Sequence, residues 1–244
     1  MPKSLFTIVL LVSILASFMP GVQIAATFDQ ERLRVLDRKG SSILVRGNAP
    51  LNHQGDFDPD MVLRHVQERF QEADAYNQLI VISLLSSGQS DERHILQKQL
   101  TYFEPQIHPD VEKVNDIKGQ TERHALYHRP ITGNWFSPLP SRNLNYLNQL
   151  IWKWLRPDDG AWDLAEELHD MLNQSNNAIV YIHCMRGIDR TGLVAGSYLA
   201  RWKKKEVNVE EILRLNHDIA KRELNWPARN ALRWSLWKAQ GVKE

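Results

Sequence analysis

An unbroken apolar run, Ala178-Ile179-Val180-Tyr181-Ile182, leads into a glycine-containing loop and then into a stretch of helical character at residues 191–202. Two asparagines come directly before the run, so the pattern predicts a buried central strand. A strand followed by a loop and a helix is the unit from which open α/β sheets are built. Ligands of such sheets bind outside the carboxyl ends of the strands, so we expect the chemistry of this chain just after Ile182.

The rest of the sequence predicts the same kind of fold. Turn residues and apolar spacing give expected strands at 42–45, 79–85, 124–131 and 178–182, and expected helices at 59–74, 91–103, 142–155, 161–173, 191–202, 208–221 and 227–239. Residues 104–122 are expected to be irregular, and residues 133–140 to form a loop. Strands separated by helices predict an α/β fold with a mostly parallel central sheet and helices on both faces, in one domain from residue 27 to residue 244.

The composition limits the classes of function. Of the 244 residues, 43% are hydrophobic and 24% are charged, which is typical of a folded globular domain. The formal net charge is only +1, so nucleic-acid binding, which relies on an excess of basic residues, is not expected. The basic run Arg201-Trp202-Lys203-Lys204-Lys205 could contact an anionic membrane surface. Because cations are also common at the C-terminal end of a helix, we interpret the run as a helix terminus.

Residues 1–26 are typical of a signal peptide. Lys3 supplies a positive charge, and the mainly apolar run from Leu5 to Met19 is shorter than the roughly 20 residues of a membrane-spanning helix. Pro20-Gly21 breaks the run before the small pair Ala25-Ala26, after which we expect cleavage. The sequence therefore predicts export to a periplasm or to the medium. Retention as a membrane anchor is the alternative, because Ile24 is a poor residue three positions before the cut.

The chain contains a single cysteine, Cys184, so no internal disulfide can form. In an exported protein a lone thiol is either an inert buried group or a reactive one, and its neighbours decide between the two. The neighbours form the segment His183-Cys184-Met185-Arg186-Gly187-Ile188-Asp189-Arg190-Thr191-Gly192. This segment connects the end of the expected strand to the start of the expected helix.

The residue types of this segment suit a phosphate monoester. A turn between a strand and a helix can aim successive backbone N–H groups at one point, and the positive end of the helix favours an anion. Gly187 permits tight curvature, and the planar guanidinium of Arg190 can bind two phosphate oxygens. The same donors favour the thiolate form of Cys184, which is the nucleophile. The segment therefore predicts a phosphate-binding loop that activates its own nucleophile.

The spacing of Cys184 and Arg190, with His183 before and Thr191-Gly192 after, resembles the signature of the protein tyrosine phosphatase superfamily. Within it, the chain is more similar to compact dual-specificity and atypical bacterial phosphatases than to large receptor-type domains. The resemblance implies a hydrolase with a cysteinyl-phosphate intermediate on Cys184 and with no metal or other cofactor. The expected substrate-binding residues are Met185, Arg186, Gly187, Ile188 and Thr191. We expect His183 to orient the loop, and the Thr191 hydroxyl to donate to the sulfur as the intermediate breaks down.

The superfamily places its general acid on a loop upstream of the nucleophile, and this chain departs from that pattern. The corresponding loop, residues 133–140, contains no carboxylate. Asp189 is the first candidate, because the loops of myotubularin-like, Sac-like and certain secreted bacterial phosphatases carry Asp directly before the Arg. Asp158 and Asp159, which precede a helix and then a strand, are the alternative. Each also has a structural interpretation, Asp189 as a partner of Arg190 or of loop N–H groups, and the pair as charges at a helix N-terminus.

Several functions are compatible with these residues. Hydrolysis of phosphorylated proteins, with phosphotyrosine as the default substrate, is the leading hypothesis. Hydrolysis of phosphoinositides or inositol polyphosphates is favoured by Asp189 and Arg186 but not by Ile188, since phosphoinositide-active bacterial relatives tend to carry Lys there. A phosphate-binding module without activity is the non-enzymatic alternative, because residues 133–140 offer no acid. A rhodanese-like sulfur transferase also uses a cysteine at a strand end, but the Arg-Thr-Gly ending suits phosphate better.

Overall fold

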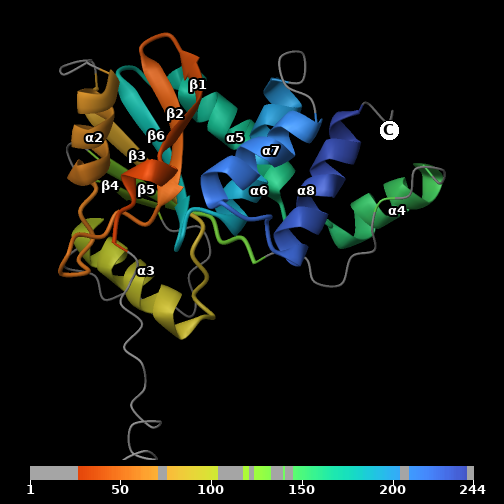
Figure 1. Cartoon of the computed structure of the whole chain (residues 1–244), viewed down its shortest axis with the longest axis horizontal. Coiled ribbons are helices and arrows are strands. Elements are labelled where there is room, and N and C mark those ends of the chain that lie inside the picture. Colours follow the sequence, from red (N-terminus) through yellow and green to blue (C-terminus); the bar gives the residue numbers. More distant parts are fainter. Residues whose placement is uncertain are drawn as a thin grey trace, which may run out of the picture.

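The computed structural model describes residues 27–70, 76–103, 118–120, 124–132, 140, 145–203 and 209–240 (Figure 1). The expected signal peptide, residues 1–26, lies outside these ranges, as does nearly all of the expected loop at 133–140. The strands are β1 (Arg34–Lys39), β2 (Ser42–Asn48), β3 (Gln78–Ser83), β4 (Lys118–Gln120), β5 (His124–His128) and β6 (Ala178–Cys184). The helices are η1 (Gln30–Arg32), α2 (Asp60–Phe70), α3 (Ser90–Phe103), α4 (Asn145–Leu155), α5 (Ala161–Gln174), α6 (Asp189–Trp202), α7 (Val209–Ala220) and α8 (Trp226–Ala239).

The strands form one sheet in the order β1-β2-β6-β3-β5-β4. β6 pairs in parallel with β2 on one side and with β3 on the other, and β3 pairs in parallel with β5. The edge strands β1 and β4 are antiparallel to their neighbours. The predicted mostly parallel sheet is therefore confirmed, and the strand that ends at Cys184 has a parallel neighbour on each side.

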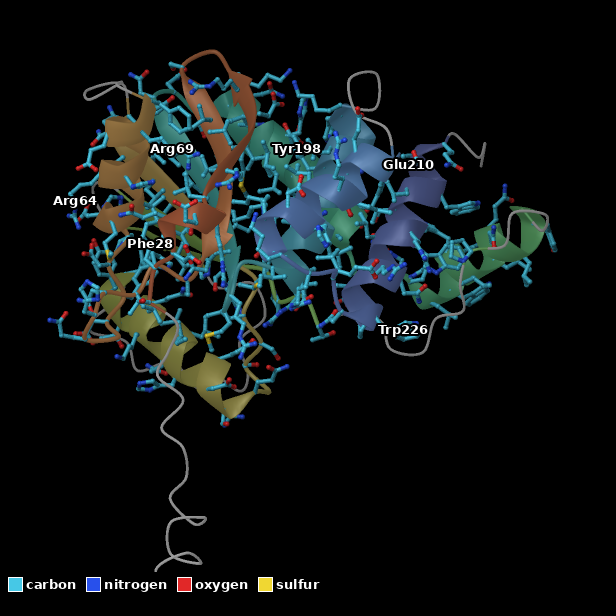
Figure 2. All side chains as sticks on the ribbon, viewed as in Figure 1. Phe28, Arg64, Arg69, Tyr198, Glu210 and Trp226 are labelled. Carbon is cyan, nitrogen blue, oxygen red and sulfur yellow. The ribbon has the colours of Figure 1, made fainter. Side chains whose placement is uncertain are left out.

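Both faces of the sheet are covered by helices, as predicted. Val180 of β6 packs in a core with residues of α5, α6 and α8, whereas the next residue, Tyr181, packs in a second core with residues of α2 and α3. Figure 1 shows α2 and α3 on one side of the strands and α5 to α8 on the other. In Figure 2, Phe28 lies on the side of α2 and α3, and Tyr198 lies on the side of α5 to α8. Because both faces are buried, β6 has a continuous apolar run instead of an alternating pattern.

The structure contains two strands that the sequence pattern does not predict, β1 and β4. β1 reads Arg34-Val35-Leu36-Asp37-Arg38-Lys39, and charged side chains of this kind are typical of an edge strand, which pairs on one side only. β4 has three residues and lies within the stretch 104–122 that was expected to be irregular. β5 ends at His128, earlier than predicted, and β6 continues two residues beyond Ile182. Cys184 is therefore the last residue of its strand.

The C-terminal tryptophans differ in their environments. Trp234 is fully buried, and its ring lies 5.5 Å from that of Trp237 in an edge-to-face arrangement, so the two rings pack against each other. Trp226, at the start of α8, is 52% exposed (Figure 2). Among the described residues, none of the helices combines the length and the apolarity that crossing a bilayer requires.

Candidate active site

The loop after β6 lies at the carboxyl edge of the sheet, between the end of β2 and the start of α6. Residues 185–188 connect Cys184 to α6, and the Cys184 side chain is 3% exposed, in the core that includes α6. Gly187 has φ +66°, in the left-handed region. A Cβ at this position would overlap the backbone of Gly47 and Asn48 in β2. Only glycine therefore fits where the loop passes β2.

Donors behind the loop bind its carbonyl groups. The Met185 carbonyl accepts a hydrogen bond from the N–H of Ala49 (3.3 Å), the Arg186 carbonyl from Nη1 of Arg32 (2.6 Å), and the Gly187 carbonyl from Nη2 of Arg46 (2.9 Å). Within the described part of the chain, the backbone N–H groups of residues 185–188 donate to no protein acceptor. Unpaired N–H groups beside the first turn of a helix form a site for an anion. The N–H groups of the loop are thus left available to a ligand.

His183 fixes the start of the loop. Its imidazole is fully buried, and burial lowers its pKa to about 4, so the ring is neutral near pH 7. Nδ1 lies 3.3 Å from the carbonyl oxygen of Cys184, and Nε2 lies 3.0 Å from Nε2 of Gln99 in α3. Because a carbonyl can only accept, we assign the proton to Nδ1, which leaves the ring's Nε2 to accept from the Gln99 amide. These bonds connect Cys184 to a helix on the opposite face of the sheet.

Arg190 is anchored by a buried acidic residue, Glu92. Nη1 of Arg190 donates to Oε2 of Glu92 (2.6 Å) and to the carbonyl of Leu84 (3.2 Å), and Nη2 pairs with Oε1. Glu92 is 4% exposed and also accepts from the N–H of Ser86 (2.8 Å). Of the five donors of a guanidinium, these three bonds leave the Nε–H and one Nη2–H, which share one edge of the group. That edge can bind two oxygens of a phosphate.

The remaining loop residues differ in what they offer to a ligand. The Thr191 hydroxyl is fully buried and has no hydrogen-bond partner among the described residues, so it is available to a ligand or to the cysteine sulfur. Ile188 is 5% exposed and packs in the core, so it offers only its backbone. Met185 packs partly buried against the core formed with α2 and α3. Arg186 is exposed to solvent.

Asp189, the first candidate acid, is bound by groups that follow α7. Its two carboxylate oxygens accept from Nη1 (3.0 Å) and Nη2 (2.6 Å) of Arg222, and Oδ1 also accepts from the N–H of Asn225 (2.7 Å). The hydrogen bond to Asp189 raises the pKa of Arg222. Asp189 is therefore the acceptor in an ion pair, and its described partner is Arg222 instead of the Arg190 considered from the sequence.

The alternative acids, Asp158 and Asp159, precede α5. Asp158 has no exposed surface, and its Oδ2 accepts from the N–H of Trp162, which is the helix-terminus role considered from the sequence. Its Oδ1 has no partner among the described residues, and burial raises its pKa. Asp159 accepts from the N–H (2.6 Å) and the hydroxyl (3.3 Å) of Thr132, which follows β5. Of this pair, Asp159 is partly exposed and Asp158 is fully buried.

Sequence reasoning missed Glu92, Arg46, Arg32 and Gln99, which all bind the segment 183–192. They lie far from that segment in the chain, and no motif marks them. The one available signal is at Arg46, a charged residue that follows the apolar run Ile43-Leu44-Val45 and is completely buried. A charge inside a buried strand requires a polar partner, which here is the loop.

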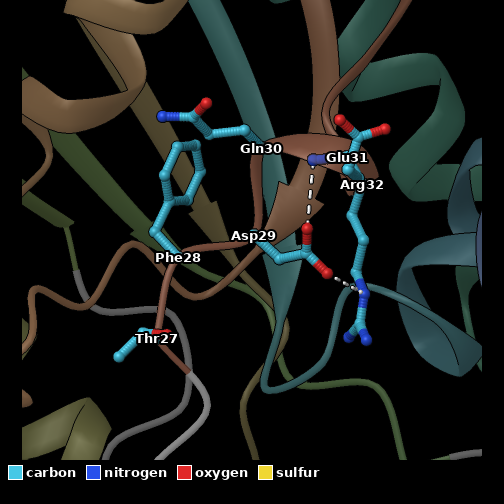
Figure 3. Close-up of a pocket in the computed structure, with 6 residues that line it drawn as sticks. All are labelled: Thr27, Phe28, Asp29, Gln30, Glu31 and Arg32. Carbon is cyan, nitrogen blue, oxygen red and sulfur yellow. Dashed lines mark hydrogen bonds and ion pairs between the residues drawn. The ribbon is translucent and has the colours of Figure 1, made fainter.

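A pocket beside the loop is formed by the first described residues (Figure 3). Its lining comprises Thr27, Phe28, Asp29, Gln30, Glu31 and Arg32. Asp29 accepts from the N–H of Glu31 and pairs with Arg32, as the dashed lines in Figure 3 show. Because Arg32 also binds the Arg186 carbonyl, the pocket adjoins the loop formed by residues 185–188.

No protein-family model matches the sequence, and no curated protein matches it. Solved structures do resemble it. A mutant form of Tk-PTP is 12% identical, with 87% of this chain and 99% of that chain covered and a TM-score of 0.46. The protein tyrosine phosphatase TbPTP1 of Trypanosoma brucei is 13% identical, with coverage of 93% and 78% and a TM-score of 0.40. A PTP-like phytase from Bdellovibrio bacteriovorus is 12% identical, with coverage of 92% and 91% and a TM-score of 0.39.

These structures are of protein tyrosine phosphatases and of a phytase like them, which is the group that the segment 183–192 resembles. The chemistry proposed below for this chain rests on the residues around Cys184.

Proposed function

We propose that this chain is a cysteine-dependent phosphatase that hydrolyses phosphate monoesters through a cysteinyl-phosphate intermediate. The observation that carries the proposal is the loop that follows Cys184, whose carbonyl groups bind donors behind it while its N–H groups have no protein acceptor among the described residues. A thiol at the base of such an anion site is placed to attack a bound phosphorus atom.

The reaction has two steps. In the first, the Cys184 thiolate attacks phosphorus, the ester P–O bond breaks, and the leaving oxygen takes a proton from an acid. In the second, a water molecule gives a proton to the conjugate base of that acid and attacks phosphorus, and the S–P bond breaks, which releases inorganic phosphate and regenerates the thiolate. The Thr191 hydroxyl, which has no partner among the described residues, is free to donate to the departing sulfur.

Charge stabilisation comes from Arg190 and from the loop. The two unused donors of Arg190 bind equatorial oxygens of the phosphoryl group, while the loop N–H groups and the N-terminus of α6 bind the rest of its charge. Asp189, directly before Arg190, is proposed to transfer protons, with Asp159 as the alternative. Asp158 is a weaker candidate, because its side chain has no exposed surface.

For the substrate, we propose phosphorylated proteins, with dual-specificity-like selectivity. The exposed Arg186 favours a second candidate, a phosphoinositide or an inositol polyphosphate. Arg186 belongs to the loop, and its side chain is accessible to a substrate. A second phosphate on the substrate would have this side chain as its partner.

A substrate panel tests the proposal. Phosphate release is measured from a phosphotyrosine peptide, a set of phosphoinositides and inositol hexakisphosphate, with the chain from residue 27 and with its Cys184→Ser variant. We expect release that the Cys184→Ser variant abolishes. Binding of inorganic phosphate to the same protein is measured alongside. If the protein binds phosphate but hydrolyses none of the substrates, it is a phosphate-binding module instead. If it neither binds phosphate nor hydrolyses a substrate, the proposal is wrong.

A further inference from the structure

Among the described residues, the guanidinium groups of four arginines take part in the hydrogen bonds that hold the segment 183–192 in place. Three of them are paired with a carboxylate: Arg190 with Glu92, Arg222 with Asp189, and Arg32 with Asp29. The fourth, Arg46, has no carboxylate partner in the described part of the chain. Of these four arginines, Arg46 is therefore the one whose charge no carboxylate of the described residues neutralises.

Arg46 is fully buried and binds two elements at once. Nη2 donates to the Gly187 carbonyl (2.9 Å), and Nη1 donates to Oδ1 of Asn216 in α7 (2.5 Å). The Asn216 amide in turn donates to the carbonyls of Ile212 (3.1 Å) and, more weakly, Gly192 (3.4 Å). The Arg46 side chain thus connects the phosphate loop to α7, and its Nε has no partner among the described residues.

The position of Arg46 in the sheet brings its charge close to the nucleophile. In the parallel pairing of β2 with β6, Arg46 lies opposite Ile182, and Asn48 lies opposite Cys184. Burial lowers the pKa of Arg46 to about 10, and the charge of Cys184 acts in the opposite direction, so the guanidinium is charged at neutral pH. Arg34 and Tyr181 are the other titratable groups that act on it.

A buried cation without an anionic partner is costly, and the cost falls when an anion occupies the neighbouring site. The occupant available at this site is the Cys184 thiolate or a phosphate group held by the loop. Arg190 is less able to supply this charge, because two of its hydrogen bonds already go to Glu92.

We propose that Arg46 is a positioning residue for the phosphate group, which holds the Gly187 carbonyl away from the site and supplies the unneutralised charge that attracts a dianionic tetrahedral ligand. The proposal rests on the proposed function of the loop. It goes further by assigning the net charge of the site to a strand residue outside the segment 183–192.

Calorimetry measures the affinity for tungstate, a tetrahedral dianion whose binding can be measured without catalysis. The wild type is compared with Arg46→Met, Arg46→Gln and Arg46→Lys. We expect the Met and Gln variants to bind tungstate about tenfold more weakly or worse, since a hydrogen-bonded charge is lost. The Lys variant keeps the charge and should bind more tightly than Gln. A purely structural role would favour Gln, which is uncharged and can still donate to the Gly187 carbonyl.

Arg201→Met is the matched control. Arg201 also donates to a carbonyl at 2.9 Å, that of Trp162, but it lies near the opposite end of α6 and pairs with Glu166. Its removal should leave tungstate binding unchanged, which would exclude a general effect of deleting an arginine that donates to a backbone carbonyl.

Circular dichroism identifies variants that fold, and if Arg46→Met does not fold, Arg46→Gln takes its place. The proposal is overturned if a folded Met or Gln variant binds tungstate as the wild type does, or if Gln binds as tightly as Lys. In that case Cys184-dependent phosphate release by the wild type would still support the proposed function. If the wild type neither binds tungstate nor releases phosphate, both proposals are wrong.

Discussion

Glu92 holds both terminal nitrogens of Arg190, across 98 residues of sequence, and leaves the Nε–H and one Nη2–H of the guanidinium unused among the described residues. The carboxylate is itself fixed by the N–H of Ser86 and is 4% exposed. Two buried charges in this arrangement are a positioning device, since the pairing restricts the arginine to one orientation.

Glu92→Gln should therefore lower kcat/KM for a phosphate monoester by about tenfold or more, because one charge-assisted bond to Arg190 is weakened. Steady-state kinetics measure the effect, and circular dichroism checks the fold. Glu167→Gln is the matched control, because Glu167 pairs with Arg129 in a more exposed setting where an ion pair contributes little. Equal activity of the Glu92 variant and the control would show that Arg190 needs no anchor.

Gly187→Ala should destabilise the protein much more than Gly160→Ala, although both glycines have positive φ. At Gly160 a Cβ has open space, so only the backbone strain of about 1–2 kcal/mol is expected. At Gly187 a Cβ would also overlap the Gly47 backbone, and we expect a loss of about 3 kcal/mol or more. Urea unfolding measures both variants. Similar losses in the two would contradict the close packing of the loop on β2.

Because His183 is buried as a neutral ring, we expect the stability of the protein to fall at acidic pH. Burial lowers its pKa to about 4 from the ordinary 6.5. At pH values between these two, His183 binds a proton in the unfolded chain but not in the folded protein. Stability contributed by the neutral ring is therefore complete above pH 6.5 and is lost as the pH falls toward 4.

Between about pH 7.5 and about pH 5, the wild type should lose about 2 kcal/mol more free energy of unfolding than His183→Asn does. Urea unfolding at the two pH values gives both differences. Comparing the two proteins cancels the contributions of His65 and His169, whose pKa values are also lowered by burial. An identical loss in both proteins would mean that His183 titrates normally.

Asp189→Asn separates the proton-transfer role from the structural one. An acid matters most for a poor leaving group, so turnover of an alkyl phosphate should fall much more than that of an activated aryl phosphate. Arg222→Gln is the control, because it removes the ion-pair partner of Asp189 and keeps the carboxylate. If both variants lose the same activity on both substrates, Asp189 serves only to bind Arg222.

The sequence was sufficient for the central strand, the loop and the helix, because an apolar run, a glycine and helical spacing are all local signals. It also predicted a mostly parallel sheet with helices on both faces. The edge strand β1 was missed, since its charged residues do not show the pattern of a buried strand. Glu92 and Arg46 were missed for a different reason. Each acts through a contact with a residue far away in the chain, and no local sequence pattern marks such a contact.

Arg32 donates to the carbonyl of Arg186, which is 154 residues further along the chain. Together with Arg46 and Glu92, it means that the donors and anchors of the loop are synthesised long before the loop itself. The segment 183–192 cannot make these contacts until η1, β2 and α3 are in place, and contacts of this sequence separation are slow to form. A nascent or partly folded chain would lack these contacts, so the proposed hydrolytic activity would arise only together with the folded domain.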